Sequence, residues 1–179
     1  MKRMRWVSAY AFALAFALLS GCGGGRAKAP AFEPADADRV MAAVREPGAR
    51  VVLVNVWATW CAPCRAEFPD LIRVAHELRG QGLRVVLVSA DFDETLPQAR
   101  AFLADHHVDF PSYHKTGDDM KFINGLDSLW TGALPATFLY DGAGHRLGFW
   151  EGMQTYETFS QAVHEVLKGR GTDSTEVKT

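Results

Sequence analysis

Two long runs of apolar, β-branched residues dominate the pattern of hydrophobic and polar positions along the chain. "VVLVNVW" covers Val51–Trp57, and "LRVVLVSA" covers residues 83–90. Each run has the length and the nearly continuous hydrophobicity of a strand that is buried on both faces of a sheet. Between them, the apolar residues of segment 62–79 follow helical spacing. A strand, a helix and a strand of these lengths predict a right-handed βαβ unit.

The rest of the pattern predicts further helices and a hairpin. Helices are expected at residues 36–46, 96–106, 120–126 and 156–167, the last of them amphipathic. "ATFLY" and "RLGFW" flank Asp-Gly-Ala-Gly, which predicts a β-hairpin. Parallel strands followed by an antiparallel hairpin and a helix predict an α/β fold, with a mixed sheet that helices cover on both sides.

The N-terminal segment has the features of an export signal. Three cations and no acid precede an apolar run that is too short for a comfortable membrane span, which needs about 20 residues. The run ends in Leu-Ser-Gly-Cys22, which resembles the bacterial lipobox. We therefore expect a lipoprotein signal peptide at residues 1–21 and a lipid anchor on Cys22. The alternative is an ordinary secretory signal with an incidental cysteine.

Composition divides the remaining chain into three parts. Residues 22–35 are rich in Gly, Ala and Pro and predict a lipidated, flexible tether. Residues 36–168 can bury a full core as one domain, and residues 169–179 form a polar tail. The formal charge of −2 becomes about −5 once the three leader cations are removed. This charge excludes a strongly basic surface and gives no indication of nucleic-acid binding.

The candidate chemistry lies where the first buried strand ends and the helix begins. Cys61 and Cys64 have C-x-x-C spacing, with Cys61 expected at the helix N-cap. Pro63 suits the first helical turn, where backbone N–H groups have no partner. The positive end of the helix dipole favours a thiolate on Cys61. Trp57 and Trp60 are expected to flank the site with apolar surface.

Two motifs together resemble a known family. Trp60-Cys61-Ala62-Pro63-Cys64 resembles the active site of the thioredoxin fold, and "VNVWATWCAPCRAEFP" is similar to the TlpA/ResA-like thiol-disulfide oxidoreductases. "GALPATFLYDGAGH" resembles the cis-proline loop of that family, which implies a cis bond before Pro135 beside the cysteines. The resemblance covers residues 36–168. It implies a thioredoxin-like fold with an extra strand-helix insert after the second core strand, within residues 91–120.

One position departs from thioredoxin itself. Asn55 stands where cytoplasmic thioredoxins carry a buried acid, and the TlpA/ResA-like proteins share this departure. These relatives carry a glutamate three residues after the second cysteine, which is Glu67 in this chain. The resemblance implies that Glu67 moves protons to and from the Cys64 thiol. The alternative is a solvated helix glutamate, as most glutamates are.

The resemblance implies an extracytoplasmic enzyme of the thioredoxin type that reduces protein disulfides. Cys61 is then the nucleophile, Cys64 the resolving cysteine, Trp60 a wall of the site and Pro135 a substrate contact. No cofactor is implied beyond the redox-active Cys61–Cys64 disulfide. The implied partners are protein thiols and disulfides, with apocytochrome c as one candidate, and a transmembrane thiol relay as electron donor. The lipid anchor would hold the protein to a bacterial membrane, facing the periplasm in a Gram-negative cell.

Other readings of the C-x-x-C pair remain open. A structural disulfide is possible outside the cytoplasm, although so small a ring adds little stability. A zinc site needs four ligands, and His106, His107 and His114 are the nearest candidates to complete one. A copper chaperone on the same fold would want a wider cysteine spacing and a matched downstream histidine. A redox sensor is a further alternative. The single-cysteine signature of a peroxiredoxin is not found.

Overall fold

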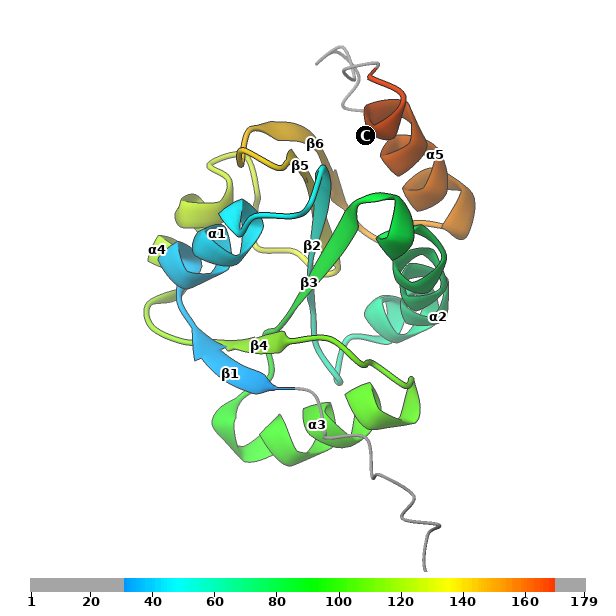
Figure 1. The fold of residues 1–179 in the computed structure, drawn as a ribbon. Coiled ribbons are helices and arrows are strands. Elements are labelled where there is room, and N and C mark those ends of the chain that lie inside the picture. The colour runs from blue at the N-terminus through cyan, green and yellow to red at the C-terminus, as the bar shows by residue number, and fades with distance from the viewer. Residues whose placement is uncertain (1–30, 170–179) are drawn as a thin grey trace, which may run out of the picture.

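The computed structural model describes residues 31–169 as one mixed α/β unit (Figure 1). The strands in chain order are β1 (Phe32–Ala35), β2 (Val51–Trp57), β3 (Leu83–Ser89), β4 (Ser112–Lys115), β5 (Ala136–Asp141) and β6 (Arg146–Glu151). The helices are α1 (Ala37–Arg45), α2 (Ala62–Leu78), α3 (Leu96–Asp105), α4 (Asp119–Leu126) and α5 (Tyr156–Leu167), with short 3₁₀ turns η1 (Arg79–Gln81) and η2 (Asp93–Thr95). These bounds confirm the predicted helices and hairpin to within a few residues.

The six strands form one sheet in the order β1-β4-β3-β2-β5-β6. β2 pairs in parallel with β3, which confirms the predicted strand-helix-strand unit. On its other side β2 pairs antiparallel with β5, and β5 pairs antiparallel with β6. All seven residues of β2 are buried, because the strand lies in the middle of the sheet and helices cover both faces.

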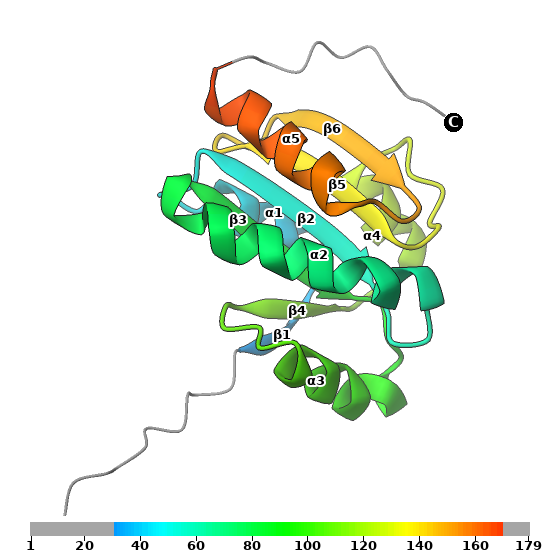
Figure 2. The same cartoon turned by 90° about the vertical axis from the view of Figure 1, so that its right-hand side faces the viewer.

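Helices cover the two faces of the sheet in separate layers (Figures 1 and 2). One apolar cluster joins α2, α3 and α5 to one face, with Phe68, Leu103 and Phe159 among its buried members. A second cluster joins α1 and α4 to the opposite face through residues such as Val40 and Phe122. The alternating side chains of β2 therefore enter both clusters. This fixes β2, and the loop that follows it, between two packed layers.

The expected insert lies between β3 and α4. It consists of α3 and β4, and β4 adds to the sheet between β3 and β1. β4 pairs in parallel with both neighbours. The connection from β3 to α3 begins beside the C-terminal end of β2, because the two strands are parallel neighbours and finish at the same edge of the sheet.

The expected tether is wrong at its last four residues. β1 (Phe32–Ala35) lies inside segment 22–35, where we expected flexible chain, and pairs in parallel with β4. Phe32 and Ala35 are buried, so the short strand covers apolar surface. Pro34 is tolerated because β1 is an edge strand, where one missing N–H costs no ladder partner.

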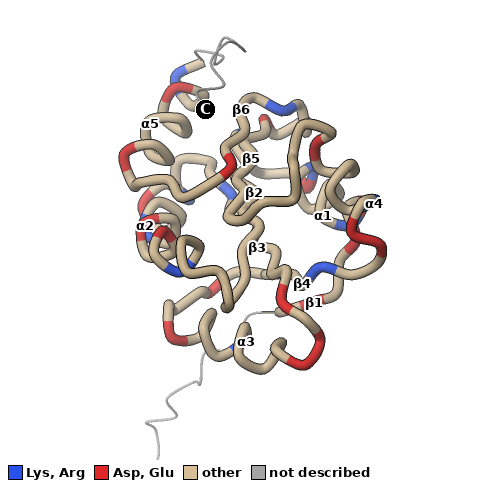
Figure 3. Tube along the Cα trace, turned by 180° about the vertical axis from the view of Figure 1, so that it is seen from behind, with Lys and Arg blue, Asp and Glu red and all other residues tan. Residues whose placement is uncertain are grey.

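Several expectations concern residues outside the described range. The signal peptide at 1–21, Cys22, the tether up to residue 30 and residues 170–179 of the polar tail all lie there. Among residues 31–169, none of the helices has the length and hydrophobicity to cross a membrane. Lys and Arg are dispersed over several elements in this part of the chain (Figure 3).

Candidate active site

The two cysteines lie at the first turn of α2. Cys61 is the N-cap residue, with an extended backbone, and its sulfur accepts a hydrogen bond from the backbone N–H of Cys64 at 3.2 Å. A disulfide joins Cys61 to Cys64, whose Cα atoms are 5.3 Å apart. Cys61 is 6% exposed and Cys64 is 0% exposed. Of the two cysteines, Cys61 is therefore the more accessible to an attacking thiolate.

The local sequence explains this placement. β2 is buried in the middle of the sheet, and α2 begins within a few residues of its end. Pro63 lies in the first helical turn, as predicted, where its missing N–H costs no hydrogen bond. The first turn contains no acidic residue. No acidic side chain of this turn therefore offsets the positive end of the helix dipole at Cys61, and the dipole favours a thiolate there after reduction.

The cis-proline loop leads into β5, which pairs with β2, the strand that precedes the cysteines. The Leu134–Pro135 bond is cis, as the resemblance implied. The Pro135 carbonyl accepts a hydrogen bond from the Gly152 N–H at 2.8 Å, which ties the loop to the segment after β6. Within the described residues, the backbone N–H and C=O of half-buried Leu134 make no hydrogen bond. Leu134 packs against the apolar cluster that contains both cysteines.

Glu67 is a buried acid. Its side chain is 2% exposed, so the alternative of a solvated helix glutamate is wrong. Oε1 accepts a hydrogen bond from Asn55 Nδ2 at 2.8 Å, and Oε2 accepts one from the Gln154 backbone N–H at 2.8 Å. Burial raises the pKa of Glu67 from 4.5 to about 7, and the two hydrogen bonds oppose this rise. Glu67 can therefore take up or release a proton near neutral pH.

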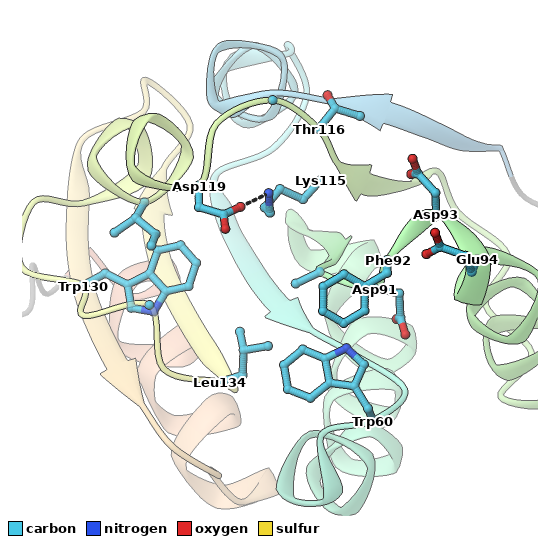
Figure 4. A pocket seen from close by; sticks show the side chains of 14 residues that line it. Trp60, Asp91, Phe92, Asp93, Glu94, Lys115, Thr116, Asp119, Trp130 and Leu134 are labelled. Carbon is cyan, nitrogen blue, oxygen red and sulfur yellow. Dashed lines mark hydrogen bonds and ion pairs between the residues drawn. The ribbon is translucent and has the colours of Figure 1, made fainter.

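Trp57 and Trp60, the two tryptophans expected to flank the site, differ in their exposure. Trp57 is fully buried against Phe68, in the same apolar cluster as Cys61 and Cys64, so its apolar surface lies on the core side of the cysteines. Trp60 is 56% exposed, and its ring stacks on that of Phe92 with centroids 6.3 Å apart. These two rings form one wall of a groove of about 600 Å³, with Leu134 and Trp130 on the opposite side (Figure 4). Trp60 is thus a wall of this groove.

The sequence reasoning missed Asp91, which holds the loop before Cys61. Its carboxylate accepts hydrogen bonds from the Thr59 backbone N–H at 3.0 Å and the Ser89 hydroxyl at 2.7 Å. The position of Asp91 in the sequence could have indicated this role. Asp91 comes just after β3, and β3 runs parallel to β2, so its carboxyl end lies beside the segment that leads to Cys61.

The histidines do not gather around the cysteines. His106 caps the C-terminal end of α3, and His107 follows it with a positive φ of 53°. His114 lies on β4, where burial lowers its pKa. Among residues 31–169, no three His, Cys, Asp or Glu side chains are grouped so that they could hold a metal ion.

This geometry defines a class of protein. A C-x-x-C disulfide at the start of the helix after a central strand, next to a cis-proline loop, is the centre of a thiol-disulfide oxidoreductase with a thioredoxin-like fold. Known structures agree. The thioredoxin-family thiol:disulfide interchange protein from Chlorobium tepidum superposes with a TM-score of 0.59 at 25% identity, over 70% of this chain and 83% of that one.

Sequence comparison gives the family. The family model described as AhpC/TSA family matches residues 26–145. The thiol:disulfide interchange protein HelX of Rhodobacter capsulatus is 33% identical over 154 residues, which are 86% of this chain and 81% of HelX. The thiol-disulfide oxidoreductase ResA of Bacillus subtilis is 31% identical over 93 residues, 52% of this chain and 48% of ResA. The chain belongs to the AhpC/TSA family, and it is an oxidoreductase of the thioredoxin type.

Proposed function

We propose that the protein reduces disulfide bonds of other proteins outside the cytoplasm. The observation that carries the proposal is the unequal accessibility of the two cysteines, of which Cys61 is 6% exposed and Cys64 is fully buried. The groove between Trp60 and Leu134 supports a polypeptide substrate, because Trp60 directly precedes Cys61 in the chain and the groove is lined by aromatic rings. The unpaired backbone groups of Leu134 offer an extended substrate strand two hydrogen-bonding partners.

The reaction is a pair of thiol-disulfide exchanges. In the reduced protein, the Cys61 thiolate attacks one sulfur of the substrate disulfide and expels the other as a thiolate, which forms a mixed disulfide. The Cys64 thiol then loses its proton and attacks the Cys61 sulfur, which expels the second substrate thiolate. The substrate gains two electrons and ends as a dithiol, and the protein ends with the Cys61–Cys64 disulfide.

Glu67 is proposed as the proton acceptor in the second exchange. Cys64 lies in the buried first turn of α2, and Glu67 lies one turn further along the same helix. Burial disfavours a thiolate, so a nearby base assists the deprotonation. A carboxyl group with a pKa of about 7 is ionised often enough to accept that proton and protonated often enough to return it.

The proposed location rests on the N-terminal sequence, and the proposed partners rest on the family resemblance. The leader and Cys22 support a lipid-anchored protein on the outer side of a bacterial membrane, where disulfides persist. A transmembrane thiol relay would return the Cys61–Cys64 pair to its reduced form. Apocytochrome c, whose cysteines must be reduced before haem is attached, is the candidate substrate.

Trapping experiments test the assigned order. With a disulfide-bonded protein substrate, Cys64→Ser should accumulate a mixed disulfide that non-reducing electrophoresis detects, and Cys61→Ser should accumulate none. Equal trapping by both variants contradicts the order. The redox potential of the Cys61–Cys64 couple tests the direction. A couple more oxidising than that of protein disulfide isomerase, about −180 mV, contradicts a reductant.

A further inference from the structure

Asn55 joins Glu67 to the strand that follows the cis-proline loop. It lies in the middle of β2 and is 1% exposed. Its Nδ2 group uses both hydrogens, one donated to Glu67 Oε1 at 2.8 Å and the other to Thr137 Oγ1 at 2.9 Å. Its Oδ1 atom is buried and has no hydrogen-bond partner among the described residues. In this arrangement the amide acts only as a donor.

This arrangement suits the ionised form of Glu67 and not the protonated form. Glu67 Oε2 already accepts from the Gln154 backbone N–H, so an added proton belongs on Oε1. There it would face Nδ2 of Asn55, and two donors would meet in a buried site. Half a turn of the amide exchanges Nδ2 with Oδ1. Oδ1 could then accept from the Glu67 carboxyl and also from the Thr137 hydroxyl, which donates no hydrogen bond within residues 31–169.

We propose that Asn55 is a positioning residue whose side-chain amide turns over when Glu67 binds a proton, donating to the carboxylate and accepting from the acid. The Thr137 hydroxyl reverses with it, from acceptor to donor. Both protonation states of Glu67 are then hydrogen-bonded to Asn55 without movement of the backbone, and the cost falls on the turned Nδ2 group, which takes the place of Oδ1, an atom with no hydrogen-bond partner among the described residues. The use of this exchange in catalysis rests on the proposed proton transfer to Glu67. The exchange itself is a property of the disulfide form and needs no substrate.

The groups that face Glu67 are neutral. They come from β2 (Asn55), from β5 (Thr137) and from the segment before α5, which contributes the Gln154 N–H. Asp70, the next acid on α2, accepts instead from the Tyr156 N–H at 3.2 Å. No charged side chain of the described part contributes to the shifted pKa of Glu67. With the disulfide intact, a titration near pH 7 in this site therefore reports Glu67 and its hydrogen bonds.

Nuclear magnetic resonance on the full chain with its disulfide intact tests the proposal. The Glu67 carboxyl carbon should titrate near pH 7, and the Asn55 side-chain NH₂ signals should shift with the same midpoint. Glu67→Gln is a matched control. Its amide must present oxygen to the Gln154 N–H and NH₂ to Asn55, so it mimics the acid. In this variant the Asn55 signals should stay at their low-pH wild-type positions throughout the titration.

Substitutions of the network give an independent result. Asn55→Leu removes a hydrogen bond to the charged form, so it should raise the Glu67 midpoint by about one pH unit. Thr137→Ser keeps the hydroxyl and should leave that midpoint unchanged.

The proposal is overturned if the wild-type Asn55 signals stay fixed while Glu67 titrates, or if the Glu67→Gln signals match the high-pH form. These two measurements decide the outcome even if Asn55→Leu does not fold. If the protein gives both expected titration results but does not reduce protein disulfides, the proposed function is contradicted and this inference stands.

Discussion

Replacing Glu67 with glutamine should make the protein more stable, and only above a defined pH. Glu67 is buried among neutral groups, where an ionised carboxylate is poorly solvated. Glutamine has nearly the same shape and never ionises. It therefore keeps the packing of α2 against β2 and removes the cost of a buried charge.

The size of the effect follows from the shifted pKa. Burial raises the pKa of Glu67 from 4.5 to about 7. Each pKa unit corresponds to about 1.36 kcal/mol, so the ionised side chain costs the folded state about 3 kcal/mol. Because the folded pKa lies above the unfolded value, the wild-type protein loses this stability as the pH rises from 4.5 to about 7. The gain from Glu67→Gln should be near zero at pH 4.5 and about 3 kcal/mol at pH 8.

Urea unfolding of the oxidised protein between pH 4.5 and pH 8.5 measures this difference. Glu94→Gln serves as a control, because it makes the same substitution at an exposed acid. That control should stay within about 0.5 kcal/mol of the wild type at every pH. Stability curves that run parallel for Glu67→Gln and the wild type would refute the reasoning, because they would mean that Glu67 ionises as freely as it does in the unfolded chain.

Three further predictions concern the loop before Cys61, the wall of the groove and the anchor. Asp91→Ala removes an acceptor from both the Thr59 N–H and the Ser89 hydroxyl, and should lower the free energy of unfolding by about 3 kcal/mol, with a smaller loss for Asp91→Asn. Trp60→Ala should change stability by less than about 0.5 kcal/mol, because the ring is exposed, and should raise KM for a protein disulfide while leaving the rate with a small aliphatic disulfide unchanged. Cys22→Ala should move the protein out of the membrane fraction without changing the disulfide reductase activity of the purified protein; membrane retention of a processed form would indicate another anchor.

The sequence alone determined the central elements of the fold and the position of the cysteines. β2 and β3 could be predicted because their runs are apolar along the whole length, which only a strand between two packed layers tolerates. The Cys61 N-cap followed from the strand-to-helix change and from Pro63. β1 could not be predicted, since "FEPA" has neither length nor hydrophobicity to indicate a strand. It forms because the β4 edge offers it hydrogen-bond partners.

The environment of Glu67 was decided by the tertiary structure. Helical spacing places Glu67 one turn from Cys64, which is compatible with either a buried or a solvated side chain. Asn55 approaches it from 12 positions earlier in the chain, and the Gln154 N–H comes from 87 positions later. Burial at this point depends on how α2 packs against β2, β5 and the segment before α5, which no local pattern encodes. The cysteines can therefore be located from a few neighbouring residues, whereas the proton affinity of Glu67 depends on groups that only folding brings together.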